Sequence, residues 1–285
     1  MTALLRLAVP NKGRLQAPTA GLLSQAGLIY ERTERSLSAP VANVDMELLF
    51  VRAEDVCEMV ADGVAALGVT GLDLLQESGA DLQVVGELGF GTCRLTAAVP
   101  NASPIQNLVE LEGMRVATAH LRVTGEFFAK QGIDMTVIPL RGSVEVAPKL
   151  DVADAIVDLV SSGSTMMVNG LRPIATLLES QAVLVARSAV EGLTDGQQQV
   201  VTMLQAAVAA RQKRYVVMNA PRDALRAIEE IIPGIEAPSV VPLAHNDKVA
   251  IHSVVDAKDV WQVLPRLKEA GATGILVLPV ESLIA

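Results

Sequence analysis

The segment DAIVDLVSSGSTM, residues 154–166, joins a β-branched run to a small polar loop. The run AIVDLV is typical of a buried strand, and SSGST is typical of a loop that enters a helix. Asp154 and Asp158 are four residues apart, so their side chains share one face in a strand or in a helix. We favour a strand, because the glycine loop then follows its carboxyl end, where open α/β sheets bind ligands.

The loop after this strand offers donors for a phosphate group. Backbone N–H groups at a helix start favour anions, and Asp158 can accept hydrogen bonds from sugar hydroxyls. The alternative is a simple turn with a helix cap, since the loop matches neither the Walker P-loop nor the dinucleotide fingerprint. The interpretation that we carry forward is a phosphorylated sugar. The loop residues are Ser161, Ser162, Gly163, Ser164 and Thr165.

Composition limits the other functions. The chain has 285 residues, 51% of them hydrophobic, and a formal net charge of −9. This balance argues against disorder, extended nucleic-acid binding and anionic membranes, but leaves room for a local basic pocket. Cys57, Cys93 and three scattered histidines lack metal-ligand spacing. The N-terminal segment does not resemble a signal peptide and no apolar run has membrane-spanning length, so we expect a soluble cytoplasmic protein.

Strand and helix patterns alternate along most of the chain, which predicts an α/β fold with a largely parallel sheet. The longest helical pattern covers residues 192–214. The patterns after it follow the order strand, helix, strand, strand, helix, strand, which is the ferredoxin-like βαββαβ unit. Pro265 should kink or split the last helix of that unit.

Several motifs resemble one enzyme family. GSVEVAPKL (142–150) and ADAIVDLVSSGST (153–165) resemble the phosphoribosyl-diphosphate-binding segment of the ATP phosphoribosyltransferase family. VPNKGRL, LGVTGLDLL, LGFGTCRL and MRVAT resemble other catalytic segments of that family. KRYVVMNAP, APSVVPL and GATGILVLP resemble the regulatory domain of its long form. The phosphate loop departs from the more frequent Thr-Gly-x-Thr-Leu but keeps the hydroxyls, and Lys248 replaces a frequent aromatic residue in the regulatory domain.

This resemblance implies an architecture and a reaction. It implies a two-lobed catalytic part like that of periplasmic binding proteins, with lobes at 1–92 plus 182–212 and at 93–181, and a regulatory domain at 213–285. The reaction joins N1 of the adenine of ATP to C1 of phosphoribosyl diphosphate and releases pyrophosphate, which Mg²⁺ accompanies. L-histidine, the end product of the pathway, is the implied inhibitor. Homo-oligomers, hexamers and dimers, are implied as well.

The resemblance also assigns roles to residues. It implies catalytic roles for Lys12, Arg14 and Asp158, although a solvated basic turn is the alternative for the first two. Polar groups at strand ends of the regulatory domain can bind the backbone of a free amino acid, or merely cap turns; these are Asn219, Ser239 and Thr273. The implied substrate-binding residues are the loop 161–165 together with Gly13, Arg52, Asp73, Glu145 and Asp154.

Alternatives remain for single residues and for the whole chain. Arg52 can be a surface residue, Asp73 a helix N-terminal carboxylate and Glu145 an exposed glutamate. His120 can line the cleft, but no base is needed because adenine N1 carries no proton. A ligand-binding module without catalysis is one competing function. A phosphoribosyltransferase for another base is the second, although such enzymes usually carry two adjacent acidic residues before the loop.

Overall fold

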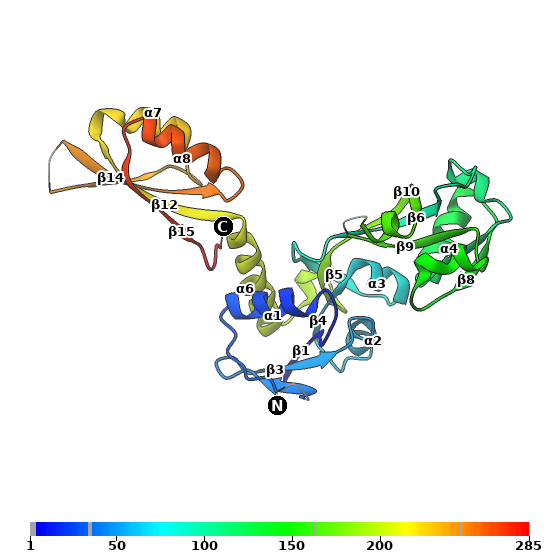
Figure 1. The fold of residues 1–285 in the computed structure, drawn as a ribbon. Helices are drawn as coiled ribbons and strands as arrows, with labels where there is room; N and C mark the ends of the chain where they lie inside the picture. Colours follow the sequence, from blue (N-terminus) through cyan, green and yellow to red (C-terminus); the bar gives the residue numbers. More distant parts are fainter. Residues whose placement is uncertain (1–3, 34–35, 162–163, 245–246, 285) are drawn as a thin grey trace. The chain divides into compact units, whose positions relative to one another are not determined.

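The computed structural model describes residues 4–33, 36–161, 164–244 and 247–284, and leaves the side chains of Ser164 and Thr165 undescribed (Figure 1). The chain divides into two compact units, residues 1–21 with 28–201 and residues 22–27 with 202–285. The larger unit contains two sheets and the smaller unit one, all accompanied by helices. The predicted α/β class is confirmed.

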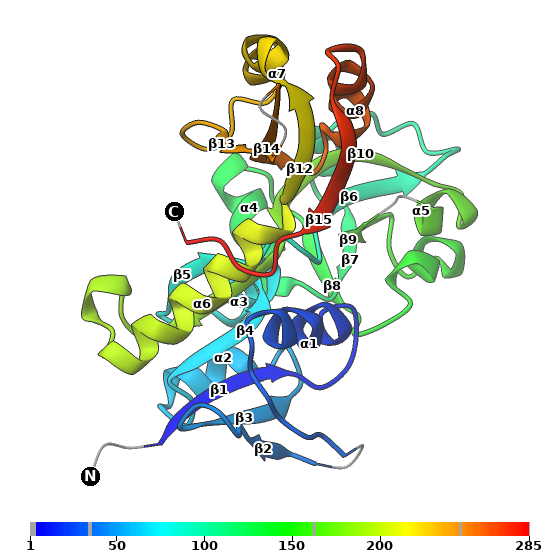
Figure 2. The same cartoon turned by 90° about the vertical axis from the view of Figure 1, so that its left-hand side faces the viewer.

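The first sheet of the larger unit has the strand order β2-β3-β1-β4-β11-β5. Strand β1 is parallel to both of its neighbours, β3 and β4, and Figure 2 shows β1 beside β3. Helices α1, α2 and α3 follow these three strands, as βα alternation requires. The elements are β1 (Leu5–Pro10), α1 (Gln16–Gln25), β2 (Ser38–Pro40), β3 (Met46–Val51), α2 (Val56–Ala61), β4 (Leu67–Gly71), α3 (Leu72–Ser78), β5 (Gln83–Glu87) and β11 (Ala182–Ala186).

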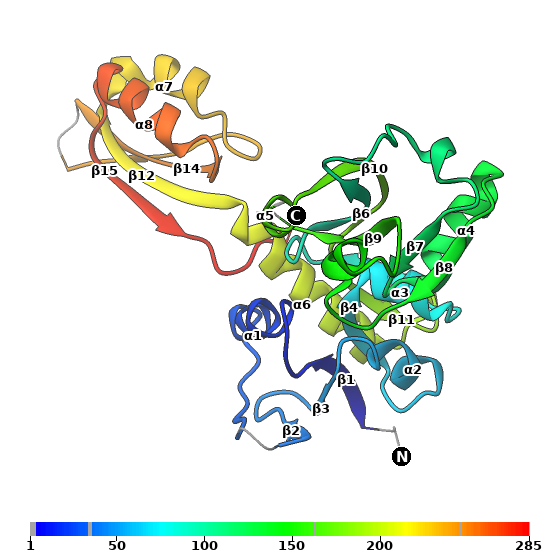
Figure 3. The same cartoon turned by 45° about the vertical axis from the view of Figure 1, so that its right-hand side comes forward.

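The second sheet has the order β10-β6-β9-β7-β8, and Figure 3 shows α4 next to β7 and β8. Strand β7 is parallel to both β8 and β9. Its elements are β6 (Cys93–Pro100), the short 3-10 helix η1 (Leu108–Leu111), β7 (Arg115–Thr118), α4 (Leu121–Gln131), β8 (Thr136–Pro139), the 3-10 helix η2 (Val144–Leu150), β9 (Ala155–Val160), α5 (Ser164–Val168) and β10 (Leu171–Ser180). The predicted strand at AIVDLV is therefore β9.

Two connections join these sheets, and they change the expected strand directions. Residues 88–92 lead from β5 into β6, and residue 181 alone separates β10 from β11. The strands at these connections pair antiparallel, β6 with β9 and β10, and β11 with β4 and β5. The sheets are mixed, and the prediction of a largely parallel sheet was wrong. The chain enters the second sheet through β6 and returns through β10 and β11. The returning strands run antiparallel to β6 in the second sheet and to β4 in the first.

Strand β10 has no clear sequence signal. Pro173 lies inside it, and its pairing with β6 shifts register between Pro173 and Ala175 and again between Thr176 and Leu178. These irregularities break the alternation by which a strand is recognised. Proline is tolerated because β10 is an edge strand of the second sheet.

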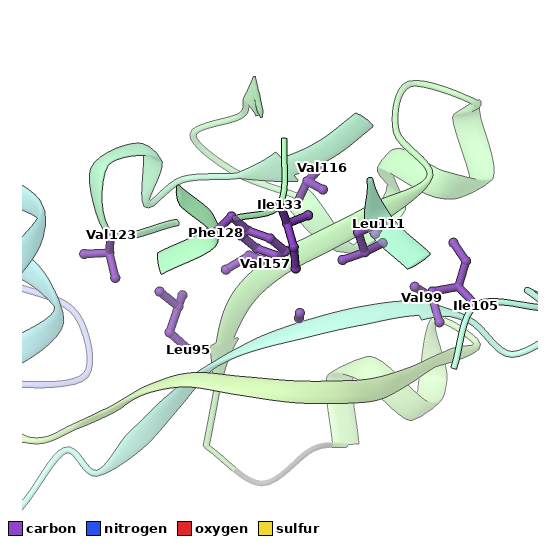
Figure 4. Close-up of a cluster of buried hydrophobic side chains, with 11 residues drawn as sticks. Leu95, Val99, Ile105, Leu111, Val116, Val123, Phe128, Ile133 and Val157 are labelled. Carbon is purple, nitrogen blue, oxygen red and sulfur yellow. The ribbon is translucent and has the colours of Figure 1, made fainter. Parts of the chain in front are cut away.

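The core of the second lobe lies between its sheet and α4 (Figure 4). Phe128 of α4 is 1% exposed and contributes the largest fully buried side chain of the described residues. Leu95 and Val157 meet it from β6 and β9. Helix α4 ends at Gly132, whose φ of 70° is the left-handed conformation that glycine adopts without strain. These contacts fix α4, and with it the loop between β7 and α4.

The smaller unit has the sheet order β13-β14-β12-β15, entirely antiparallel. This is the predicted ferredoxin-like unit, with α7 and α8 packed on one face (Figure 1). Helix α6 (Asp195–Arg211) runs from the larger unit into it and matches the predicted long helix. The remaining elements are the 3-10 helices η3 (Val190–Gly192) and η4 (Arg222–Ala224), with β12 (Lys213–Pro221), α7 (Leu225–Ile231), β13 (Ser239–Pro242), β14 (Lys248–Asp256), α8 (Val260–Glu269) and β15 (Thr273–Pro279).

Pro265 does not split the last helix, since α8 continues through it from Val260 to Glu269. Proline costs a helix one hydrogen bond and some steric strain. Burial of Val263 and Leu267 against the sheet offsets this cost, because both side chains are at most 8% exposed.

The packing around Phe128 predicts a large stability effect. Phe128→Ala should lower the free energy of unfolding of the larger unit by about 3–5 kcal/mol, because it leaves a cavity in a closely packed core. Urea titration of the full chain measures the loss. Val109→Ala is the control, since Val109 is 71% exposed and its truncation should change stability by less than about 0.5 kcal/mol. A similar loss in both variants would contradict the assigned core.

Candidate functional site

The first sheet brings charged residues to the carboxyl ends of its parallel strands. Lys12, Gly13 and Arg14 form the turn after β1, and Gly13 has a φ of 80° that glycine adopts readily. Arg52 follows β3, where it is exposed and pairs with Glu54 at 3.3 Å. Because Pro10 and Val51 are paired in register, the residues after them leave the same sheet edge. This edge is where ligands bind in α/β folds.

Asp73 is the centre of a buried hydrogen-bond network. Its carboxylate Oδ1 accepts hydrogen bonds from the Ser180 hydroxyl at 2.5 Å and from Arg14 Nη2 at 2.9 Å. Its backbone N–H donates to the same Ser180 hydroxyl at 3.0 Å. Arg14 also donates to the carbonyl of Gly91, so the guanidinium is held at two points. These bonds connect the turn after β1, helix α3 and the last residue of β10.

The environment of Asp73 keeps it ionised. Burial alone raises the pKa of this carboxyl, but the close approach of His120, the hydrogen bond from Ser180 and the charge of Arg14 bring the pKa down to about 2. The His120 contribution is the weakest geometrically, because the 3.5 Å from its Nε2 to Oδ2 of Asp73 exceeds a good hydrogen bond. The lowering of the Asp73 pKa therefore rests mainly on the hydrogen bonds from Ser180 and Arg14.

His120 lies two residues after the end of β7 and is 6% exposed. Its backbone N–H donates to the Thr118 hydroxyl at 3.0 Å, which fixes the start of the following loop. Neither of its ring nitrogens, nor Oδ2 of Asp73, has a hydrogen-bond partner among the described residues. Buried polar atoms without partners are rare, and several together indicate a place where a ligand group binds.

Asp158 has the opposite electrostatic character. Burial and the nearby negative charge of Glu145 raise its pKa, while a hydrogen bond from Leu159 N at 2.8 Å and the proximity of His120 oppose the rise. Glu145 reaches this region from η2, and Asp158 from β9. Asp158, near the end of β9, therefore feels the charge of Glu145 and the proximity of His120. A buried carboxyl with a raised pKa, such as Asp158, is typical of functional sites.

A cavity of about 530 Å³ lies beside the Asp73 network, because Ser180 of that network lines it. Ser161, the exposed residue that follows β9, contributes to its wall together with Ser180. Cys93 also lines it, and burial raises the pKa of that thiol, so it is a small apolar wall residue rather than a nucleophile. The other lining residues are Leu72, Glu87, Thr92, Arg94, Val160, Glu179 and Gln181.

The prediction that Asp154 shares the ligand site with Asp158 is corrected by the structure. Asp154 precedes β9, at the opposite end from Ser161. Its carboxylate accepts hydrogen bonds from Arg115 N, Nε and Nη2 at 2.9, 3.2 and 2.9 Å, and these bonds lower its pKa. The four-residue spacing is real, but at roughly 3.3 Å per residue it separates the two carboxylates by about 13 Å along the strand. Asp154 is a structural ion-pair partner.

The remainder of the predicted phosphate loop is only partly described. Ser162 and Gly163 lie outside the described residues, as do the side chains of Ser164 and Thr165. The backbone of the latter two begins α5, which has 5 residues. The helix that was expected after the loop is therefore short, so its N-terminal dipole is weaker than that of a long helix.

In the smaller unit, the three predicted allosteric residues share one face of the sheet. Asn219 is paired with Thr273, whose hydroxyl donates to the Asn219 carbonyl at 3.4 Å. Ser239 pairs with His252 on the far side of β14. Directly paired residues point to the same face, and the neighbours Met218, Ile251 and Val249 point to α7 and α8. The three side chains thus lie on the face that these helices leave open.

Ser180 is the functional-site residue that sequence reasoning missed. Its hydroxyl contacts a group 107 residues earlier in the chain. No local pattern distinguishes it from an ordinary serine at the end of a strand. His120 was expected to line the cleft, but its position beside Asp73 depends on a contact between α3 and α4 that no spacing in the sequence indicates.

Comparison with known proteins identifies the family. The sequence model described as ATP phosphoribosyltransferase matches residues 52–207, and the model described as HisG, C-terminal domain, matches residues 210–282. The ATP phosphoribosyltransferase of Gemmatimonas aurantiaca is 42% identical, covering 99% of this chain and 100% of that protein. The chain belongs to the ATP phosphoribosyltransferase family. The family predicted from the motifs is confirmed, and the second match fits the long form.

Other ATP phosphoribosyltransferases agree with this assignment. The one from Natronomonas pharaonis is 43% identical, over 98% of this chain and 100% of that protein. A solved structure of an ATP phosphoribosyl transferase (HisG:HisZ) complex from Thermotoga maritima has a TM-score of 0.62 and 29% identity, covering 72% of this chain and 98% of that one. The predicted α/β catalytic part, with one sheet in each lobe, and the added C-terminal domain are confirmed. No helix of residues 4–33, 36–161, 164–244 and 247–284 has the length and apolar character to cross a membrane.

The low pKa of Asp73 predicts how acid affects stability. The carboxylate stabilises the folded chain above the unfolded-state pKa near 4, and this stabilisation is lost as the pH falls toward about 2. The stability difference between the wild type and Asp73→Asn should therefore shrink by about 2 kcal/mol between pH 6 and pH 2. Urea unfolding of both proteins at these pH values measures it. An equal difference at both would show that Asp73 titrates alike in the folded and unfolded chains.

Proposed function

We propose that this chain transfers the 5-phosphoribosyl group of phosphoribosyl diphosphate to N1 of the adenine of ATP, releasing pyrophosphate. This is the first step of L-histidine biosynthesis, and we place it in the cytoplasm, where ATP is available. The observation that carries the proposal is the arrangement at β9 in a chain that matches the family along its length. That strand presents Asp158 and leads to Ser161 at the wall of a cavity beside the Asp73 network.

The residues divide between the two substrates by their chemistry. We assign the loop 161–165 to the ribose 5-phosphate, and Asp158 and Glu145 to the ribose hydroxyls, which suit carboxylate acceptors. Lys12, Gly13, Arg14 and Arg52 would meet the diphosphate. Oδ2 of Asp73, whose Oδ1 is already engaged by Ser180 and Arg14, would accept a hydrogen bond from ATP.

Charge stabilisation and positioning would supply the catalysis. Bond cleavage at C1 of the ribose leaves an oxocarbenium-like centre and a departing anion, and adenine N1 attacks without losing a proton. Lys12 and Arg14 would stabilise the departing pyrophosphate, and Arg14 is pre-oriented because Asp73 and the Gly91 carbonyl hold it. No protein nucleophile is required, and the site consists of groups that bind and orient.

A metal ion is expected in this family, and we propose Mg²⁺ carried by the diphosphate. Within the described residues, no three His, Cys, Asp or Glu side chains form a group that could hold a metal ion. Magnesium bound through phosphates and water needs only one or two carboxylates, so the residues present fit this arrangement. The carboxylates of Asp158 and Glu145 are the candidates to contact it. When bound, the ion would neutralise part of the leaving-group charge.

We also propose the domain boundaries and the regulation. The catalytic lobes would be residues 1–92 with 182–212 and residues 93–181, and the regulatory domain residues 213–285. L-histidine would bind to the open sheet face that carries Asn219, Ser239 and Thr273. Tyr215 and Leu276 of the same face are 37% and 60% exposed, which supports pairing of such domains in a homo-oligomer, a dimer or a hexamer.

Pyrophosphate release tests the reaction and the role of Asp158. Wild type should release pyrophosphate with phosphoribosyl diphosphate and ATP, but not with other bases. Asp158→Asn should weaken phosphoribosyl-diphosphate use by about 1.5–3 kcal/mol, because charge-assisted hydrogen bonds to hydroxyls are lost. Asp154→Asn is the matched control and should keep the KM for phosphoribosyl diphosphate. Normal kinetics of Asp158→Asn would remove that residue from the site, and absence of turnover with any base would favour a binding module.

Histidine titration of the rate tests the regulatory site. Histidine should inhibit wild type by favouring one arrangement of domains or subunits, since its proposed site belongs to a different unit from the catalytic residues. Asn219→Ala and Ser239→Ala should raise the inhibitory histidine concentration about tenfold while leaving the uninhibited rate unchanged. Unchanged inhibition in both variants would exclude this face. A wild type that histidine never inhibits would refute the regulatory proposal.

A further inference from the structure

Helix α3 carries two acidic residues one turn apart, and both meet the first turn of α4. Asp73 lies with Oδ2 3.5 Å from Nε2 of His120, the residue that precedes α4. Glu77 accepts hydrogen bonds from Arg122 N through Oε1 and from Val123 N through Oε2, both at 3.0 Å. Residues four apart share one face of a helix, so a single face of α3 makes both contacts. These contacts join the lobe of the first sheet to the lobe of the second.

Glu77 supplies what the sequence of α4 lacks. The first N–H groups of a helix have no partner within the helix, and Ser, Thr, Asp or Asn usually caps them. The residue at that position is His120, whose side chain makes no capping hydrogen bond. Its ring is directed to Asp73 instead. The carboxylate of Glu77 thus acts as the cap of α4, although it belongs to the other lobe.

Arg122 of α4 adds a second favourable charge to this contact, at the C-terminus of α3. Helix α3 ends at Gly79, which has a φ of 65°. A Cβ atom at Gly79 would overlap the guanidinium of Arg122, so that cation lies at the C-terminus of α3. An anion at the start of one helix and a cation at the end of the other are both favourable, because each opposes the local helix dipole.

We propose that Glu77 is a positioning residue that sets the His120 ring beside Asp73 and so builds the ATP side of the site. Glu77 fixes Arg122 and Val123, and His120 is the residue immediately before this turn. Without this contact the start of α4 loses its cap, and Nε2 of His120 is no longer held beside Oδ2 of Asp73. The kinetic part of this inference rests on the proposed function.

Kinetics of Glu77 variants form the first part of the test. Glu77→Ala should raise the KM for ATP about tenfold, because it removes two charge-assisted hydrogen bonds that hold the start of α4 near Asp73. The KM for phosphoribosyl diphosphate should change little, because Asp73 is assigned to ATP. Glu77→Gln keeps one acceptor oxygen and should lie between wild type and Glu77→Ala. Glu112→Ala is the matched control, since Glu112 accepts a hydrogen bond from Asp134 N at 2.8 Å within the second lobe. It should keep both KM values.

NMR of the histidine rings forms the second part. The chain has three histidines, so loss of a signal in His120→Asn assigns that ring. The His120 ring signal should shift in Glu77→Ala and partly in Glu77→Gln, but not in Glu112→Ala. An unshifted signal in a folded Glu77 variant overturns the proposal, as does a shifted signal with an unchanged KM for ATP. If wild type makes no phosphoribosyl-ATP, the proposed function fails, and the ring signals still decide whether Glu77 positions His120.

Discussion

The buried carboxylate of Asp73 is the constraint on which the site depends. A fully buried charge is costly unless its oxygens are hydrogen-bonded and a counter-charge is near. Here Ser180 and Arg14 meet one oxygen, and they come from the end of β10 and from the turn after β1. The requirement to satisfy one carboxylate therefore fixes three segments that are far apart in the sequence. Arg14, the flexible member of the three, becomes oriented before any substrate arrives.

Asp73 and Asp158 show how one fold gives two carboxylates different properties. Hydrogen bonds and the charge of Arg14 lower the pKa of Asp73 to about 2, whereas burial and the charge of Glu145 raise the pKa of Asp158. His120 lies near both and carries no hydrogen bond of its own at the ring. Asp73 therefore remains a fixed anion that organises the protein. Asp158 becomes a better acceptor when hydroxyl groups or a cation bind beside it.

The sequence predicted the elements of the fold better than the contacts between them. The strand at AIVDLV, the long helix before Arg211 and the ferredoxin-like unit all follow from local patterns, and the structure contains them. Strand β10 has no such pattern, because Pro173 and two register shifts interrupt it. Spacing also placed Asp154 with Asp158, but a shared face does not mean a shared end of the strand. Asp154 is occupied by Arg115, and only the tertiary structure reveals that partner.

The net charge of −9 poses a problem for a protein that would bind two polyanions, because long-range attraction cannot guide them. The structure concentrates cations locally instead, with Lys12, Arg14 and Arg52 leaving the same edge of the first sheet. Arg14 is already paired with Asp73, so its charge is partly balanced until a stronger anion approaches. The backbone of the loop after β9 would add donors that carry no net charge. Substrates complexed with a divalent cation would bring less negative charge into this site, so the proposed metal-bound phosphates would suit an acidic chain with few local cations.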